Sequence, residues 1–188
     1  MGRAPRNRTI ILTAEELEQY RLRLRTIRAP VSVVDVVDAT IWQDVLAVLD
    51  FLPPHSFDLV FADPPYNCAK DFNGTSFGPL DLEGYERWLD SWVSKLPRLL
   101  KKEGTIYVCG DWRSSACIHR ALLKYFRVRN RITWEREKGR GAKANWKNNS
   151  EDIWFATVSD DYVFNVDAVK VKRRVMAPYT DVNGRPKD

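Results

Sequence analysis

The segment Asp63-Pro64-Pro65-Tyr66 places a carboxylate, two prolines and an aromatic ring in four consecutive positions. Two prolines fix the backbone and remove two amide donors, so the turn is rigid and its carbonyl oxygens are free to accept hydrogen bonds. A carboxylate beside a free carbonyl suits a target with two N–H donors, such as an exocyclic amino group, and the tyrosine offers a flat face for a planar base. The segment therefore predicts a site for an amino-bearing base. The alternative is a plain surface turn in which Asp63 is a cap and Tyr66 a core residue. We interpret the other proline pair, Pro53-Pro54, as a plain turn of this kind.

Basic residues are concentrated late in the chain. From Arg127 to Lys147 there are eight basic and two acidic residues, a local balance of +6, whereas the whole chain carries +5. This balance favours a polyanionic partner, most simply DNA, over a solvated loop with no partner. Gly139-Arg140-Gly141 has the glycine spacing of a nucleotide loop, but no helical periodicity follows it, so we interpret it as a flexible loop that faces DNA. Arg113, just after another strand end, is a further candidate. The main candidate DNA-binding residues are Lys138, Arg140, Lys143, Asn145, Trp146 and Lys147.

Alternating helices and strands are expected to position these residues. Asp63 directly follows a predicted strand, and ligands of open α/β sheets bind outside the carboxyl ends of the strands. The order predicts an α/β sheet that is parallel at first and closes with a late antiparallel strand pair. A capping box formed by Thr13 and Glu16 predicts the start of the first helix. We expect helices at 14–27, 42–49, 85–100 and 115–125, strands at 31–37, 57–62, 104–109, 127–134 and 152–158, a turn at 101–104, and loops at 72–80 and 137–150.

Composition limits the class of protein. A chain of 188 residues with 44% hydrophobic and 29% charged residues is typical of one globular domain, and it has no apolar run long enough to cross a membrane. The basic N-terminus is followed by only three apolar residues, so it cannot be a secretory signal, and we expect an intracellular, cytoplasmic protein. Cys68, Cys109 and Cys117 lack a metal-ligand spacing and only two histidines could join them, so neither a disulfide framework nor a metal site is expected.

The motif and its flanks resemble a known family. Asp63-Pro64-Pro65-Tyr66 matches the catalytic motif of the amino-methylating DNA methyltransferases, and the order of parts looks like the beta class of adenine-N6 enzymes. The resemblance implies a Rossmann-like sheet and S-adenosylmethionine-dependent methylation of the adenine N6 amino group in DNA, without a metal. It also implies that Tyr66 stacks on the extruded base, while the Asp63 carboxylate and the Pro64 carbonyl accept the two amino hydrogens. The supporting flanks are Asn67 and the segments 57–62, 85–100, 103–108, 132–134 and 145–156.

One part of the family pattern is absent. The beta class carries a glycine-rich Phe-x-Gly-x-Gly cofactor signature C-terminal to everything matched, and this sequence ends without it. We therefore expect the catalytic half of a methyltransferase, incomplete at the C-terminus, whose cofactor half lies in a missing segment or a second subunit. By resemblance the cofactor contacts are Asp63 and Asp38-Ala39 at the end of the first strand, although a plain turn carboxylate is an equal alternative for Asp38. Residues 1–30 would be a basic arm with a surface helix, and 31–188 the catalytic part.

Three other functions are kept as alternatives. Methylation of cytosine N4 uses the same geometry, although more often with serine in place of Asp63, and RNA adenine methylation could use the same turn. A catalytically inactive DNA-binding module would also explain the absent cofactor signature. An open sheet that ends where the cofactor half would begin exposes a strand edge and an apolar face. We therefore expect the chain alone to form oligomers, such as homo-oligomers, or to be poorly soluble.

Overall fold

The computed structural model describes residues 10–72, 75–140, 144, 146–171 and 180–185. Its helices are α1 (Ala14–Arg21), α2 (Val33–Val36), α3 (Val45–Val48), the 3-10 helix η1 (Leu49–Phe51), α4 (Leu82–Val93), α5 (Leu96–Leu99), α6 (Ser115–Tyr125) and α7 (Val166–Val169). Its strands are β1 (Leu24–Arg25), β2 (Thr40–Ile41), β3 (Phe57–Ala62), β4 (Lys70–Phe72), β5 (Thr75–Phe77), β6 (Leu100–Gly110), β7 (Arg127–Arg140) and β8 (Asn148–Thr157). No helix in these ranges is both long enough and apolar enough to span a membrane.

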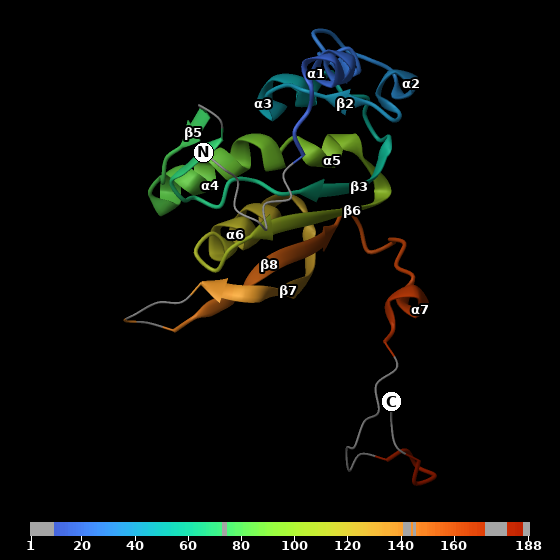
Figure 1. The fold of residues 1–188 in the computed structure, drawn as a ribbon. Coiled ribbons are helices and arrows are strands. Elements are labelled where there is room, and N and C mark those ends of the chain that lie inside the picture. Colours follow the sequence, from blue (N-terminus) through green and yellow to red (C-terminus); the bar gives the residue numbers. More distant parts are fainter. Residues whose placement is uncertain (1–9, 73–74, 141–143, 145, 172–179, 186–188) are drawn as a thin grey trace.

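The main sheet has four strands in the order β3-β6-β8-β7. β3 and β6 are parallel, whereas β6 with β8 and β8 with β7 are antiparallel. The arrowheads of β3, β6 and β7 consequently point to the same side of the molecule (Figure 1). The predicted mixed sheet with a late antiparallel pair is confirmed, and its carboxyl edge brings three chain segments together.

Helices α4, α5 and α6 cover one face of this sheet. Tyr85, Leu89 and Trp92 of α4 are buried with Ile118 of α6 against the sheet residue Ile106, in one hydrophobic cluster. These side chains share one face of α4 because its apolar positions recur at helical spacing and face the sheet. The opposite face carries a stacked series of rings, in which Tyr107 lies 4.8 Å from Phe155 between ring centroids.

The N-terminal part differs from the prediction. The Thr13–Glu16 capping box is confirmed, but α1 ends at Arg21 rather than near residue 27, and a short parallel pair, β1 with β2, follows. The predicted strand 31–37 is wrong: the Asp35 carboxylate accepts hydrogen bonds from the backbone and hydroxyl of Ser32, and these contacts start the short helix α2. None of the valines of α2 is buried, and β-branched residues favour a strand only where a sheet packs on them.

Other element boundaries shift for local reasons. The predicted turn 101–104 lies inside β6, where the pairing register with β3 jumps between Leu100 and Thr105. The predicted loop 72–80 contains β5, which pairs with β4 as an antiparallel hairpin. The single helix expected at 85–100 is two helices, because Pro97 occupies the first turn of a new helix, α5. β7 and β8 extend toward each other beyond their predicted ends, into the segment expected to be a loop.

Candidate functional site

The Asp63-Pro64-Pro65-Tyr66 turn begins directly after the last residue of β3. Ala62 pairs with Val108 of β6, so Asp63 stands at the carboxyl edge of the two parallel strands. Asp63 is exposed, and the Tyr66 hydroxyl donates a hydrogen bond of 2.6 Å to its Oδ1. Burial and this contact with the Asp63 carboxylate both raise the pKa of Tyr66, so the phenol stays protonated. The Asp63 carboxylate and the Tyr66 side chain, which the sequence predicted to act together, are therefore joined through the Tyr66 hydroxyl.

A buried tyrosine of α4 forms a hydrogen bond to the turn. The Tyr85 hydroxyl donates to the Pro65 carbonyl at 2.7 Å, and the Tyr85 side chain is completely buried. Burial raises the pKa of Tyr85, and the nearby Asp111 raises it further, so the hydroxyl remains a donor. The sequence predicted a helix at 85–100, but the contact of Tyr85 with the turn was missed. The available signal was the tyrosine itself, because a buried phenol requires a polar partner.

Asn67 closes the segment that follows the turn. Its amide nitrogen donates to the Leu80 carbonyl at 3.0 Å, and its amide oxygen accepts from the Leu80 backbone N–H at 2.7 Å. The backbone of Asn67 has φ of 51°, in the left-handed region that asparagine tolerates better than most residues. Asn67 was matched to the family pattern, but its clamp on Leu80 was not predicted, since the partner lies 13 residues away.

One thiol and one further carboxylate lie at the same edge of the sheet. Cys109, near the end of β6, is buried; burial raises its pKa to about 11, with Asp63 and Glu151 contributing in the same direction. Glu151 of β8 is paired with Arg136 of β7 at 2.5 Å. Neither Cys109 nor Glu151 was a predicted site residue, because the pairing of β6 with β8 that brings them beside the turn is long-range. The turn thus faces a polar edge built from three strands.

The predicted DNA-binding residues fall in and near the β7–β8 hairpin. Lys138 and Arg140 lie in the last part of β7, and Trp146 and Lys147, both exposed, immediately precede β8. Lys143 and Asn145 lie outside the described residues. Because Gly110 pairs with Asp152, the start of β8 is adjacent to the carboxyl end of β6. The start of β8 and the turn after β3 therefore lie at the same edge of the sheet, the edge to which the arrowheads of β3 and β6 point (Figure 1).

Asp38 and Ala39 are not at the end of a sheet strand. They lie between α2 and β2 in the N-terminal part, and Asp38 has φ of 53°. The expected strand before them does not exist, so their predicted cofactor contact loses its structural basis. Asp63 is the predicted cofactor residue that the structure does place at the sheet edge.

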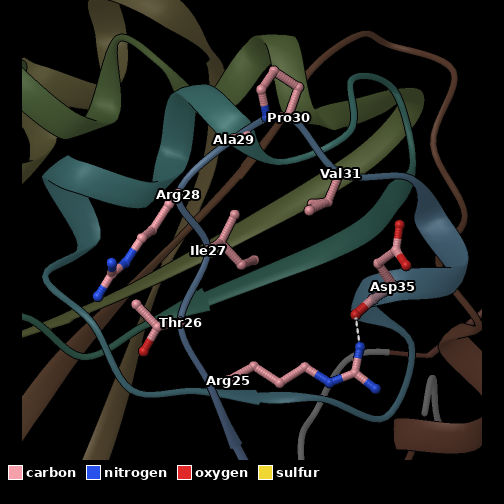
Figure 2. Close-up of a pocket in the computed structure, with 8 residues that line it drawn as sticks. All are labelled: Arg25, Thr26, Ile27, Arg28, Ala29, Pro30, Val31 and Asp35. Atoms are coloured by element: carbon pink, nitrogen blue, oxygen red, sulfur yellow. Dashed lines mark hydrogen bonds between the residues drawn. The ribbon is translucent and has the colours of Figure 1, made fainter.

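An open hollow of about 430 Å³ lies in the N-terminal part. The Arg25 guanidinium, at one side of it, donates to the backbone carbonyl of Asp35 (Figure 2). The hollow does not include the turn, so it adds no residue to the site. Its lining residues are Arg25, Thr26, Ile27, Arg28, Ala29, Pro30, Val31 and Asp35. In the part of the chain that the structure describes, no cluster of three histidine, cysteine or acidic side chains could hold a metal ion.

Comparisons with known proteins agree on one family. The family described as DNA methylase matches residues 57–179. The chain is 33% identical over 139 residues to DNA adenine methyltransferase YhdJ of Escherichia coli (strain K12), covering 70% of this chain and 45% of that protein. It is 28% identical over 149 residues to Type II methyltransferase M.HpaI of Haemophilus parainfluenzae, covering 77% and 46%. The chain thus spans less than half the length of these two relatives.

Solved structures support the fold. The PvuII DNA methyltransferase (cytosine-N4-specific) superposes with a TM-score of 0.60 at 15% identity, over 78% of this chain and 55% of that chain. TTHA0409 of Thermus thermophilus, solved with S-adenosyl-L-methionine, gives a TM-score of 0.51 at 21% identity, over 66% and 55%. The predicted Rossmann-like methyltransferase sheet is therefore confirmed as the fold.

Proposed function

Because the chain belongs to the DNA methylase family, we propose that it forms the base-binding half of a site-specific, adenine-specific DNA methyltransferase that uses S-adenosylmethionine as methyl donor. The observation that carries this proposal is the exposed Asp63 carboxylate, held beside Tyr66 in a rigid turn at the carboxyl edge of the sheet. The relative whose name specifies adenine, DNA adenine methyltransferase YhdJ, supports adenine over cytosine and DNA over RNA.

The residues of the turn have distinct roles in this proposal. An adenine must leave the double helix before its amino group can be reached. The Tyr66 ring stacks on the extruded base, and the Asp63 carboxylate and Pro64 carbonyl accept the two amino hydrogens. Asp63 already accepts a hydrogen bond from Tyr66, so the incoming amino group takes over an acceptor that is correctly placed. These acceptors concentrate electron density on the amino nitrogen, which makes positioning and electrostatics the main sources of catalysis.

We propose that the described residues build only a small part of the donor side of the site. S-adenosylmethionine would supply the methyl group, and of the residues predicted to contact it only Asp63 lies at the sheet edge. Asp38 and Ala39, which lie in the N-terminal part, have no role in this proposal. We propose that the donor is held mainly by residues outside this sequence, either in a further segment of the same protein or in a second subunit.

The uncovered side of β3 is where such a partner would dock. Within the described ranges β3 pairs with β6 alone, so its other edge carries unpaired backbone groups. Leu59 is 52% and Phe61 58% exposed on the face opposite the helices. An apolar face beside a free strand edge favours pairing with another chain. A second copy of this chain is the alternative occupant when the partner is missing.

The decisive experiment supplies the rest of the protein from its source gene and identifies the methylated base. Duplex DNA is incubated with the assembled enzyme and labelled S-adenosylmethionine, and the nucleosides are separated by mass spectrometry. N6-methyladenine is the expected product, N4-methylcytosine would overturn the adenine assignment, and an RNA duplex of the same sequence should remain unmethylated. Asp63→Ala is expected to abolish methylation and to leave DNA affinity within about threefold, because the carboxylate acts on the amino group and not on phosphates. Equal loss of both would refute the role of Asp63.

A further inference from the structure

The loop after β6 presents an exposed tryptophan that the proposed function does not use. Trp112 is 64% exposed, although a large aromatic side chain is usually at least half buried. The guanidinium carbon of Arg113 lies 5.2 Å from the centroid of the Trp112 ring, within the range of a cation–π contact. The two adjacent residues therefore form one flat, cationic and solvent-accessible unit.

The loop that carries this unit is held by local hydrogen bonds. Oδ1 of Asp111 accepts from the backbone N–H of Arg113 at 3.0 Å, from the N–H of Ser114 at 2.9 Å and from the Ser114 hydroxyl at 2.9 Å. Gly110 approaches α6 so closely that a Cβ atom there would lie 2.4 Å from Cδ1 of Ile118. The backbone of the loop that carries Trp112 is thus fixed, so the loop loses little conformational freedom when a ligand stacks on the indole ring.

The loop lies beside the proposed base site. β3 and β6 are parallel and Ala62 pairs with Val108, so Asp63 and the residues after Gly110 leave the sheet at the same edge. Asp111 is also close enough to raise the pKa of Tyr85, whose hydroxyl holds the Pro65 carbonyl. The Trp112 loop and the base-binding turn are consequently neighbours at one sheet edge.

We propose that Trp112, with Arg113 against its ring, is a stacking platform for an unstacked nucleobase of DNA next to the extruded adenine. This inference rests on the proposed function, because extrusion of one base leaves its neighbours with uncovered faces. An indole ring offers such a face a sequence-tolerant partner, and the guanidinium of Arg113 adds a positive charge near the phosphates. The platform binds base faces, so it contributes affinity without reading sequence.

The test compares single-stranded DNA with and without bases. The affinity of the 188-residue chain for a fluorescein-labelled strand of about 16 nucleotides, a length on the scale of single-strand binding sites, is measured by anisotropy at one fixed salt concentration. A strand of the same length that carries abasic sugars at every position is measured beside it. Loss of one stacked base should weaken binding roughly tenfold, within the span of about 5- to 150-fold that stacking energies imply. Trp112→Ala should therefore bind the normal strand roughly tenfold more weakly and the abasic strand unchanged, whereas Trp112→Phe keeps affinity within about threefold.

Trp42 provides the matched control. It is 74% exposed in the N-terminal part, next to β2, so Trp42→Ala removes another largely exposed indole, away from the sheet edge, and should leave both affinities unchanged. A second readout is photocrosslinking with 5-iododeoxyuridine beside the target adenine, which should attach the DNA to the peptide that contains Trp112. Thermal melts of both alanine variants should match the wild type, since neither ring is buried.

The outcomes separate this inference from the proposed function. Wild-type affinity of Trp112→Ala for the normal strand, or an equal loss on the abasic strand, would overturn the platform. No preference of the wild-type chain for the normal over the abasic strand would overturn it as well. A base-dependent loss in Trp112→Ala supports the platform even if the assembled enzyme proves to methylate cytosine, in which case only the adenine assignment fails.

Discussion

Tyr85→Phe tests whether the buried tyrosine fixes the turn formed by residues 63–66. The change removes one oxygen atom and leaves the aromatic ring, which packs against Trp88 with ring centroids 5.5 Å apart. What is lost is the hydrogen bond of 2.7 Å to the Pro65 carbonyl. Prolines at positions 64 and 65 provide no amide donors of their own, and this bond joins the turn to α4.

The expected cost follows from the burial of the two partners. Tyr85 is completely buried, but Pro65 is only partly buried, so water can reach its carbonyl in the variant. A typical hydrogen bond contributes about 0.5–1.5 kcal/mol, and an unsatisfied buried acceptor costs about 1–3 kcal/mol. We therefore expect the free energy of unfolding to fall by about 1.5 kcal/mol, which for a domain of this size lowers Tm by roughly 3–6 °C.

Tyr125→Phe is the matched control. Its hydroxyl donates to Oδ1 of Asp90 at 2.9 Å, but Asp90 also binds Lys124 at 3.0 Å and is one-third exposed, so solvent and the lysine replace the lost donor. We expect this variant to lose less than about 0.5 kcal/mol. Urea unfolding followed by tryptophan fluorescence measures both variants, and extrusion of 2-aminopurine from duplex DNA measures the function of the turn. Tyr85→Phe should reduce extrusion severalfold, and Tyr125→Phe should not.

Two results would refute this reasoning. If Tyr85→Phe unfolds at the same urea concentration as Tyr125→Phe, the hydroxyl of Tyr85 does not stabilise the turn. If it is destabilised as expected but extrudes the base normally, the bond supports the fold alone, and the turn is rigid because of its prolines.

Three further predictions concern neighbouring groups. Asn67→Ala should be destabilised by about 1 kcal/mol more than Asn67→Gly, because both lose the clamp on Leu80 while only alanine is strained at positive φ; equal unfolding curves would contradict this. Cys109 ionises at about pH 11 in the folded chain and near its ordinary value of 9.0 in the unfolded chain, so the folded state binds more protons between these values. Stability should therefore fall from pH 9 to 11 less steeply in Cys109→Ala than in the wild type, and parallel curves would contradict it. Phe61→Ser should reduce self-association in sedimentation, whereas Val163→Ser, which changes an exposed residue outside the sheet, should not.

The sequence was informative wherever local signals were strong. The strand 57–62 and the helix 115–125 were predicted with the bounds that the structure gives. Turn residues stand at both ends of the strand and before the start of the helix. The prediction of a strand from Val31 to Val37 was wrong because the local signal was not supported by packing. The composition favours a strand, but no neighbouring strand buries the segment, and a serine–aspartate cap begins a helix instead. The cofactor contact predicted for Asp38 relied on that strand and stays a prediction.

The turn proposed to bind the base was therefore determined by the sequence itself. Its rigidity comes from two prolines, its acceptors from a carboxylate and a carbonyl without a competing amide, and these properties are local. The tertiary structure alone decided which groups surround the turn: Tyr85 beneath it, Glu151 and Cys109 beside it, and Trp112 on the adjoining loop. Those contacts join segments that lie far apart in the chain, and they depend on strand pairing and helix packing, which no local pattern specifies.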